Sequence, residues 1–350
     1  MKVVTKRKNL QPGTLKAQNQ WIHESILDSI CEIETLSVVP DLPRDEDFKC
    51  EWDPTVEQNG SAKAALTSDG KRIFISTEYA PFVYLNKDSS KSLSRFTHLE
   101  LCRGLNMLNA SNVQNMSCMF KDTEYAASCF CIYGLNEWDT HNVTAMSAMF
   151  YYAGHCSNRW SPGDLSKWNV SNVQDMHSMF SQTGATKMTN MWFIGDLGQW
   201  DTHNVTDMSW MFEEAGRYAV KFDVGNLDHW DVSNVISMSS MFDKSGQYSD
   251  VWNVGDLSRW NTKSVLYMTS MFACAGYEAD SWTIGDISKW NVSQVNDMSY
   301  MFSYAGHLAE SWNIGPINHW NVKNGVYHIC FRTRKMDEPR WDYRSLQKKG

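Results

Sequence analysis

The apolar residues in the last two thirds of the chain recur with a period of 30 residues. A tryptophan opens each repeat, and a Met-Phe pair begins eleven residues after each of the first six tryptophans. A fixed period of this length is typical of proteins that stack one unit many times, and not of a globular enzyme domain. We therefore expect the recurring residues to form a continuous core. They are Trp138, Trp168, Trp200, Trp230, Trp260, Trp290 and Trp320, with Phe150, Phe180, Phe212, Phe242, Phe272 and Phe302.

The pattern within one repeat predicts a short strand and a short helix. In residues 163–184, the apolar positions from Val173 to Phe180 are spaced by three and four residues, as on one face of a helix. Gly184 follows at a place where a left-handed residue ends a helix. The brief alternation in residues 252–257 predicts a short strand instead. The expected fold is an α/β repeat solenoid with one strand and one helix in each coil of about 30 residues, capped at both ends.

The chain divides into four predicted segments. Residues 1–60 are expected to hold a helix and then a linker, and residues 61–101 a β-rich cap over the open end of the stack. Residues 102–331 are expected to form the solenoid of about seven coils, the last of which degenerates into a C-terminal cap. Residues 332–350 are a basic C-terminal tail.

Three local patterns within the first two segments lead to more detailed predictions. Apolar residues at helical spacing, beginning with Trp21, predict an amphipathic helix within residues 15–34. Residues 40–60 contain prolines and an acidic cluster, which favours a linker or an irregular segment. Residues 71–86 are β-rich and are interrupted at Pro81, which predicts two short strands.

The charge of the chain is unevenly distributed. The net charge is −8, yet residues 1–20 carry +5 and residues 332–350 carry +4, so the part between them carries −17. An acidic body with basic ends is suited to bind polyanions, to dock onto acidic neighbours, or to fold its own tails back. Solvated tails are the plainest interpretation of the basic ends.

Neither a membrane span nor a secretory signal is recognisable. The longest apolar runs are too short to cross a bilayer, and no apolar segment follows the basic N-terminus. We therefore expect a protein of the cytoplasm, or one incorporated into a particle such as a virion, with the cell surface as the alternative location.

The nine cysteines do not follow the repeat. Their odd number and irregular spacing favour buried thiols over a disulfide framework. Cys129 and Cys131 form a Cys-x-Cys pair, which keeps a zinc site conceivable, although the Cys-x-x-Cys pairs usual in such sites are missing. We expect no metal and no cofactor.

The sequence contains no motif of a metalloprotease, a phosphate-binding loop, a dinucleotide-binding turn or a nucleophile elbow. We therefore expect no catalytic residue and no enzymatic activity. Asparagines in glycosylation-type sequons recur with the repeat, and we interpret them as capping and turn residues. The Asp or Asn that follows each tryptophan could line up ligands for a cation, but stacked hydrogen bonding is the favoured interpretation.

One polar column is a candidate partner-binding site. The third residue after each tryptophan alternates between a basic residue and serine. If coils rise by about 5 Å, as neighbouring strands do, basic side chains recur every ~10 Å along one edge and could contact a repetitive anionic partner. A position beside a helix N-terminus, or simple solubility, explains the column nearly as well. Its basic members are His141, His203, Lys263 and Lys323.

The repeats resemble the BspA-like leucine-rich-repeat surface-protein family. The pattern is clearest in residues 200–216 (WDTHNVTDMSWMFEEAG) and 290–306 (WNVSQVNDMSYMFSYAG), and it extends over about residues 102–331. The resemblance implies a leucine-rich-repeat-like solenoid used for surface display, adhesion or protein contact, without enzymatic activity. Repeats of that family are usually shorter, and many of its members carry a signal peptide or an anchor.

These observations favour a non-enzymatic repeat scaffold that mediates protein–protein contact within a larger assembly, such as a virion. The alternative is an adhesin-like surface-binding module that is exported by another route. A binder of polyanions or nucleic acid through the basic tails is disfavoured, because the body of the chain is acidic. Assembly through the basic termini is a further expectation.

Overall fold

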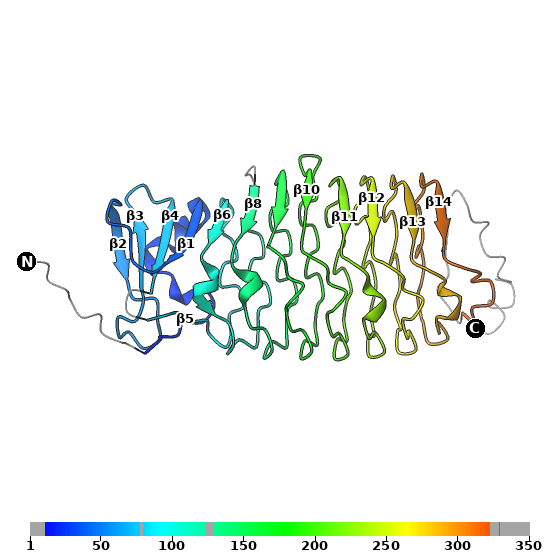
Figure 1. Cartoon of the computed structure of the whole chain (residues 1–350), viewed down its shortest axis with the longest axis horizontal. Coiled ribbons are helices and arrows are strands. Elements are labelled where there is room, and N and C mark those ends of the chain that lie inside the picture. Colours follow the sequence, from blue (N-terminus) through cyan, green and yellow to red (C-terminus); the bar gives the residue numbers. More distant parts are fainter. Residues whose placement is uncertain (1–10, 78–79, 124–128, 323–328, 330–350) are drawn as a thin grey trace, which may run out of the picture.

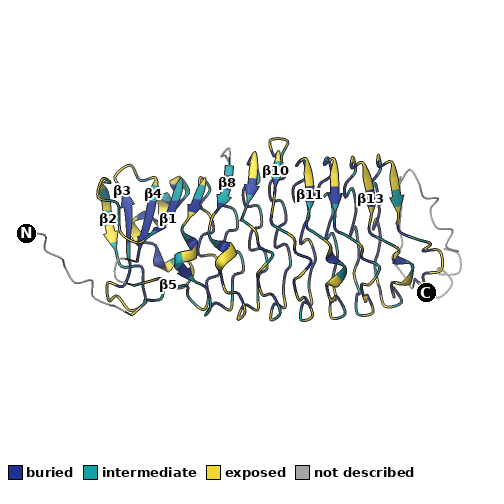
Figure 2. Cartoon of the chain, viewed as in Figure 1, coloured by how far each residue is buried: buried dark blue, intermediate teal, exposed yellow. Residues whose placement is uncertain are grey.

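The computed structural model describes residues 11–77, 80–123, 129–322 and 329. The described chain forms one elongated row of layers, with the N-terminal strands at one end and the last repeat at the other (Figure 1). Buried residues line the inside of the row, whereas exposed residues gather on loops and strand ends (Figure 2).

Short strands and 3-10 helices are the regular elements of the described chain. The helices are η1 (Gln18–Trp21), η2 (Glu24–Glu32), η3 (Leu105–Met107), η4 (Leu135–Glu137), η5 (Leu227–His229) and η6 (Ile287–Lys289). The strands are β1 (Thr35–Val39), β2 (Phe48–Trp52), β3 (Lys63–Thr67), β4 (Arg72–Ser76), β5 (Val83–Tyr84), β6 (Leu101–Arg103), β7 (Leu108–Asn109), β8 (Cys129–Ile132), β9 (Arg159–Ser161), β10 (Met191–Trp192), β11 (Lys221–Asp223), β12 (Val251–Asn253), β13 (Ser281–Thr283) and β14 (Ser311–Asn313).

One eight-stranded sheet joins the N-terminal strands to the first repeats, in the order β10-β9-β8-β6-β1-β4-β3-β2. The pairs β2–β3 and β3–β4 are antiparallel, and the other pairs are parallel. Strands β6, β8, β9 and β10 come from successive repeats, so pairing joins equivalent residues, as when Trp160 of β9 pairs with Trp192 of β10. The parallel pairs β11–β12 and β13–β14 continue this arrangement in later repeats.

Aromatic rings stack along the row of repeats. The phenylalanine rings of neighbouring Met-Phe pairs lie 5.3 to 5.6 Å apart and nearly parallel. A second ladder of rings, from Phe130 to Trp312, meets these phenylalanines edge-on. Such contacts stabilise by about 0.5–1.5 kcal/mol each, beyond the burial of area. All the recurring tryptophans and phenylalanines expected in the core are buried.

The stretch around each Met-Phe pair is a ribbon of turns, and the prediction of one short helix per repeat is wrong. The amides of Met176 and Phe180 donate to carbonyls of the next repeat, at 3.0 and 2.9 Å, whereas the amide of Met179 donates to Met176, three residues back. An α-helix would use each amide for the carbonyl four residues earlier. Because every second amide of this stretch donates to a carbonyl of the neighbouring repeat, the hydrogen bonds of an α-helix cannot form. We name this stretch, residues 207–216 in one repeat, the Met-Phe segment.

Two residues with side chains adopt the left-handed conformation in every Met-Phe segment. In residues 207–216 they are Trp210, with φ of 55°, and Glu214, with φ of 54°. This conformation costs about 1–2 kcal/mol per residue. The amides of the same two residues donate to the next repeat at 2.9 and 2.8 Å, which offsets the cost. Gly216 is left-handed too, as its position predicts, but it ends a ribbon of turns and not a helix.

The N-terminal region differs from its predictions in two places. The segment 15–34 forms η1 and η2, which are 3-10 helices and not one amphipathic α-helix, although Trp21 is buried as expected. The predicted linker, residues 40–60, contains strand β2, so it belongs to the sheet. Residues 71–86 hold two short strands, β4 and β5, on either side of Pro81, and this prediction is confirmed.

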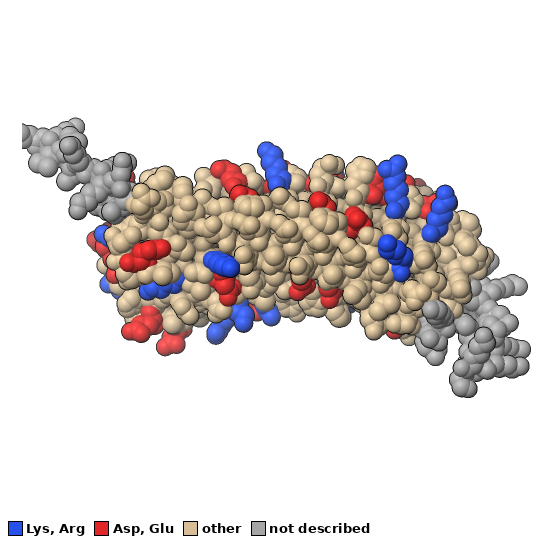
Figure 3. Space-filling model, turned by 90° about the horizontal axis from the view of Figure 1, so that it is seen from below, with Lys and Arg blue, Asp and Glu red and all other residues tan. Residues whose placement is uncertain are grey.

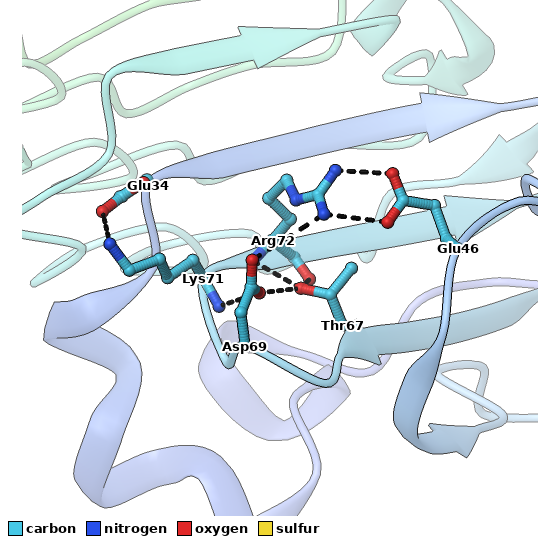
Figure 4. A network of polar contacts seen from close by, with 6 residues as sticks. All are labelled: Glu34, Glu46, Thr67, Asp69, Lys71 and Arg72. Carbon is cyan, nitrogen blue, oxygen red and sulfur yellow. Dashed lines mark hydrogen bonds and ion pairs between the residues drawn. The ribbon is translucent and has the colours of Figure 1, made fainter.

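Ion pairs around the β3–β4 turn hold the neighbouring segments in place (Figure 4). The guanidinium of Arg72 donates to both carboxylate oxygens of Glu46, at 2.5 and 2.8 Å, just before β2. The ammonium of Lys71 donates to Glu34 at 2.6 Å, just before β1. Asp69, within the turn, accepts from the amide of Lys71 at 3.0 Å. The sequence pattern of a linker missed these contacts because their partners lie 26 and 37 residues apart.

A degenerate repeat precedes those that the tryptophan pattern identifies. The amides of Ser89, Lys91, Leu93 and Arg95 donate to carbonyls of residues 115–121 at 2.9 to 3.1 Å, as in a Met-Phe segment. Lys91 and Arg95 hold the two left-handed positions, with φ of 58° and 71°. Stacking therefore begins before residue 102. The sequence pattern misses this repeat because serine and leucine replace the usual Met and Phe.

Several predictions concern residues outside the described part of the chain. These are the basic N-terminal residues 1–10, residues 323–328 of the predicted C-terminal cap, and the basic tail at 332–350. Within the described residues, no helix combines the length and the apolar character needed to cross a membrane.

Candidate functional site

The predicted basic column lies on exposed turns that follow the opening tryptophans. His141, His203 and Lys263 are exposed, and Lys323 lies outside the described residues. The carbonyls of the two histidines are bonded across repeats, because the side-chain amides of Asn172 and Asn234 donate to them at 2.7 Å each. The basic column therefore runs along the row of repeats. Its role in binding a partner remains a prediction.

Each histidine of this column has an aspartate partner two residues earlier. Nδ1 of His141 lies 2.7 Å from a carboxylate oxygen of Asp139, and Nδ1 of His203 lies 2.8 Å from one of Asp201. Partial burial opposes ionisation of Asp139, but hydrogen bonds from His141 outweigh it and lower the pKa of the carboxyl group. A protonated histidine is thus neutralised by its neighbour. The row offers an anionic partner less charge than the sequence alone suggests.

A shallow depression of about 480 Å³ crosses neighbouring Met-Phe segments. It arises because Ala148 and Ser178 are small at the position where the next repeat has Trp210. Trp210 and Tyr151 contribute aromatic rings from two different repeats. The remaining lining residues, which are mainly polar, are Lys121, His177, Gln182 and Glu213.

Contacts between repeats order the acidic and imidazole groups of this depression. The hydroxyl of Ser181 donates to Glu213 at 2.8 Å. Nδ1 of His177 lies 3.0 Å from the hydroxyl oxygen of Ser209. The His177 ring also meets the Trp210 ring edge-on, with centroids 5.1 Å apart. The indole is therefore fixed in place although its outer part is exposed.

The other end of the depression is more sheltered. Burial raises the pKa of Tyr151, and the negative charges of Glu213 and Asp122 raise it further. The ammonium of Lys121 lies 5.0 Å from the centre of the Tyr151 ring, within range of a cation–π contact. The depression thus combines two aromatic rings with one cation and one carboxylate.

Exposed aromatic residues recur on the Met-Phe segments. Trp210, Tyr267 and Tyr300 are 39%, 44% and 44% exposed, whereas the stacked rings of the core are buried. Large aromatic side chains that are exposed at a defined place on a repeat are suited to contact a partner. This strip of surface is therefore the strongest candidate for a contact site in the described chain.

A charged cluster adjoins the depression on the next repeats. Glu214 accepts hydrogen bonds from Lys244 at 2.8 Å and from Arg217 at 3.2 Å. Burial opposes the ionisation of Glu214, but these two cations outweigh it and lower the pKa of the carboxyl group. At Asp243 burial outweighs the opposing charge of Lys244 and raises the pKa to about 7. The cluster ties two repeats together, so we interpret it as structural.

The other candidates from the sequence have structural contacts. The sequon asparagine Asn204 donates to the carbonyl of Ser171 in the preceding repeat at 2.7 Å. The side chain of Asn169, in the Asp/Asn column, accepts from the amide of Ser171 at 3.0 Å within its own turn, so this bond is local and not the expected stacked one. Burial raises the pKa of the Cys102 thiol, and it raises that of Cys274 to about 11. Among the described residues, no group of three or more His, Cys, Asp or Glu side chains is arranged to hold a metal ion.

Sequence reasoning missed the depression, although one signal for it was present. The position of Trp210 holds small residues in most other repeats, namely Cys118, Ala148, Ser178, Ser240 and Ser270. A tryptophan in such a column must project beyond its neighbours, since the backbone of every repeat follows the same path.

The fold defines a repeat protein of stacked 30-residue units whose Met-Phe segments are joined by hydrogen bonds between repeats. A family model described as "Mycoplasma protein of unknown function, DUF285" matches residues 90–216, 125–249, 157–276 and 219–332. Because these matches together cover more than half of the chain, the protein belongs to this family. No curated protein and no solved structure gives a significant match.

Proposed function

We propose that this protein is a non-enzymatic solenoid scaffold of the BspA-like, leucine-rich-repeat-like kind, which binds a protein partner and forms part of a larger assembly. The depression lined by Tyr151 and Trp210 is the contact surface that we assign to the partner. The observation that carries this proposal is the exposed indole of Trp210, which is held by His177 above a floor of small residues.

The chemistry of the depression favours a protein as its partner. Tryptophan and tyrosine supply large, rigid contact areas and are enriched among the residues that dominate binding energy. The ammonium of Lys121 and the carboxylate of Glu213 add groups that fix the orientation of a bound segment. A mixed surface of this kind matches the apolar centre and polar rim of protein interfaces.

The hydrogen bonds of His177, which lines the depression, favour a binding role over a catalytic one. His177 and Ser209 are within hydrogen-bond distance, but the hydroxyl of Ser209 donates to Asp207 and its side chain is buried. In a serine nucleophile the base accepts the hydroxyl proton and an acid orients the base. Here the carboxylate of Asp207 accepts from the hydroxyl of Ser209 and does not orient His177. This arrangement favours a structural chain of hydrogen bonds over a catalytic nucleophile.

The distribution of charge also favours a protein partner over nucleic acid. The face shown in Figure 3 carries acidic and basic side chains side by side on a largely uncharged surface. Nucleic-acid binders gather their cations into a patch or stripe that follows the phosphate backbone. The alternative function is that of a surface-binding module outside the cell. We also propose that the basic termini contribute to assembly, and that the protein lies in the cytoplasm or in a particle.

A pair of matched variants tests the proposal. Trp210→Ala removes the aromatic wall of the depression, whereas Met188→Ala removes a side chain that is 62% exposed and does not line it. Both substitutions are on the surface and should leave the fold intact. In affinity purification from the native source, we expect the first variant to lose a partner that the second retains. Equal recovery of all partners by both variants would contradict the proposal.

A further inference from the structure

We propose that Lys91, Arg95 and Lys121 form a binding site for an oxyanion, such as a phosphate or carboxylate group, at the N-terminal end of the row of Met-Phe segments. The proposal goes beyond the contact with a protein partner, because this site has its own cavity, which shares Lys121 alone with the depression at Trp210. Lys91 and Arg95 line only this cavity and Trp210 lines only the depression, so either proposal can fail without the other.

The three cations line a cavity of about 360 Å³. Ser94 and Cys118 are the small side chains in its wall, so the cavity has room for a group of a few heavy atoms. Gln18 and Asn19, from the N-terminal segment, also line it, with their side-chain amides directed to Asp88 and to the main chain at Lys91 and Ser92. The cavity therefore joins three segments that are distant in sequence, with the cations as its charged donors.

The ladder between repeats brings these cations together. The amide of Arg95 donates to the carbonyl of Lys121 at 3.1 Å, so these residues are neighbours in adjacent layers. The amide of Lys91 donates to Ser117 at 3.1 Å, one layer away. Lys91 is also the single charged residue at its position, because the later repeats have Cys, Ala, Ser, Trp or Tyr there. Only the degenerate repeat introduces positive charge here.

None of these three cations forms an ion pair with another described residue, in contrast to Arg72, Lys71 and Lys244 elsewhere. Gathering like charges without a counter-charge is unfavourable, and an anion would relieve the repulsion. Lys121 is held in place by the Tyr151 ring, 5.0 Å from its ammonium. The site therefore gathers three positive charges, one of them positioned by an aromatic ring, that no ion pair within the described chain neutralises.

Two acidic residues lie near the cations, and neither neutralises them by an ion pair. Asp122 lines the cavity, where burial raises the pKa of its carboxyl group and the charge of Lys121 opposes that shift without a direct ion pair. Asp88 accepts from the amide of Ser90 at 3.1 Å and from the side-chain amide of Gln18 at 3.4 Å. These neutral donors are the hydrogen-bond partners of the Asp88 carboxylate, and the charge of Lys91 acts on it through space, lowering its pKa further.

An oxyanion matches the donors of this site. Arginine presents a planar fork of N–H groups that binds two oxygens of a carboxylate or phosphate, and lysine adds point charges that rotate to fit. A neutral or cationic ligand would leave the charges of Lys91, Arg95 and Lys121 uncompensated. Phosphate groups and acidic side chains share this chemistry, so the experiment must separate the two sources.

The test compares thermal unfolding in sodium phosphate and in sodium chloride at equal ionic strength and pH. A ligand that binds only the folded state raises the unfolding midpoint. We expect phosphate to raise the midpoint of the wild-type protein above its value in chloride. The variant K91Q/R95Q/K121Q should lose this shift. A control variant, K167Q/K187Q/K289Q, removes the same charge from exposed lysines elsewhere and should keep it.

A second probe, a hexaglutamate peptide, identifies the source of the anion. A larger shift with phosphate supports a site for a free phosphate group, and a larger shift with the peptide supports a site for an acidic protein segment. Absence of a shift with both probes overturns the proposal, and so does an equal shift in the wild-type protein and both variants. If the triple variant does not fold, as judged by circular dichroism, Arg95→Gln alone decides in the same way.

Discussion

The indole N–H of Trp230 donates to the main-chain carbonyl of Leu197 at 2.8 Å, across two adjacent repeats. Both residues are buried. The same bond recurs at 2.8 to 3.0 Å for the opening tryptophans from Trp138 to Trp290. The indole N–H is therefore a reason for tryptophan to recur at this position, in addition to its bulk. A phenylalanine of similar apolar character has no polar hydrogen to donate.

Removal of this hydrogen bond should destabilise the protein although the aromatic ring is kept. Trp230→Phe removes one of the two hydrogen bonds to the buried carbonyl of Leu197, which still accepts from the amide of Trp200 at 3.0 Å. The lost bond should cost about 0.5–1.5 kcal/mol. Urea unfolding measures the loss, with the exposed Trp210→Phe as the control that should change little. If the two variants unfold at the same urea concentration, the hydrogen bond does not contribute to the stacking.

The ladder of phenylalanine rings should tolerate truncation poorly. Phe242 is completely buried and stacks with Phe212 and Phe272 at 5.4 and 5.5 Å. Phe242→Ala opens a cavity in the middle of the row and should cost about 3–5 kcal/mol. Tyr300→Ala, on the exposed strip, serves as the control in the same denaturant series. Similar midpoints for both variants would show that the core lies elsewhere.

The period of 30 residues was sufficient to predict the core, because each repeat packs mainly on its neighbours and equivalent residues meet. The conformation of the Met-Phe segment was not predictable from the same pattern. Spacing by three and four residues from Val173 to Phe180 suits one face of a helix, but a ribbon of turns also returns such residues to one side. The choice depends on amides that bond to the next repeat, which no single repeat reveals.

The candidate sites were less predictable from the sequence than the core, because they depend on residues that are neighbours only in space. The alternation of His141, His203 and Lys263 with serine was visible along the sequence, but their aspartate partners reduce its value for binding an anion. The depression at Trp210 requires small side chains in two preceding repeats. The cations Lys91 and Arg95 join Lys121 only through a degenerate repeat that lacks the Met-Phe signal.

Asp243 should make stability depend on pH. Burial raises its pKa from the ordinary value of 3.8 to about 7, with Glu213 and Glu214 adding to the effect of burial and Lys244 and Arg217 opposing it. Between these two values the folded state holds a proton that the unfolded state has lost, so the contribution of Asp243 to stability falls as pH rises.

The variant Asp243→Asn isolates this contribution, because it remains uncharged at every pH. The difference in denaturant midpoint should still be partial near pH 5 and should reach its full size near pH 8, with the variant gaining relative stability as pH rises. Taking the difference between the two proteins cancels the titration of other groups. A difference that stays constant between these pH values would contradict the raised pKa.

The cysteines should behave as thiols that do not stabilise the fold through disulfides. Burial raises the pKa of Cys102 and Cys274, which keeps these thiols protonated and unreactive at neutral pH. A reducing agent should therefore leave the thermal unfolding midpoint unchanged. A drop of many degrees on reduction would instead indicate stabilising disulfides and an oxidising compartment.

The central claim, that the Met-Phe segments form the surface that binds a protein partner, is tested most directly by site-specific cross-linking. A photoreactive benzoylphenylalanine in place of Trp210 preserves an aromatic wall at the depression. Irradiation in the native source should join the protein covalently to a partner, and the same group in place of Met188 should not capture that partner. A cross-linked product that is equally abundant at both positions, or absent at position 210, would contradict the assignment.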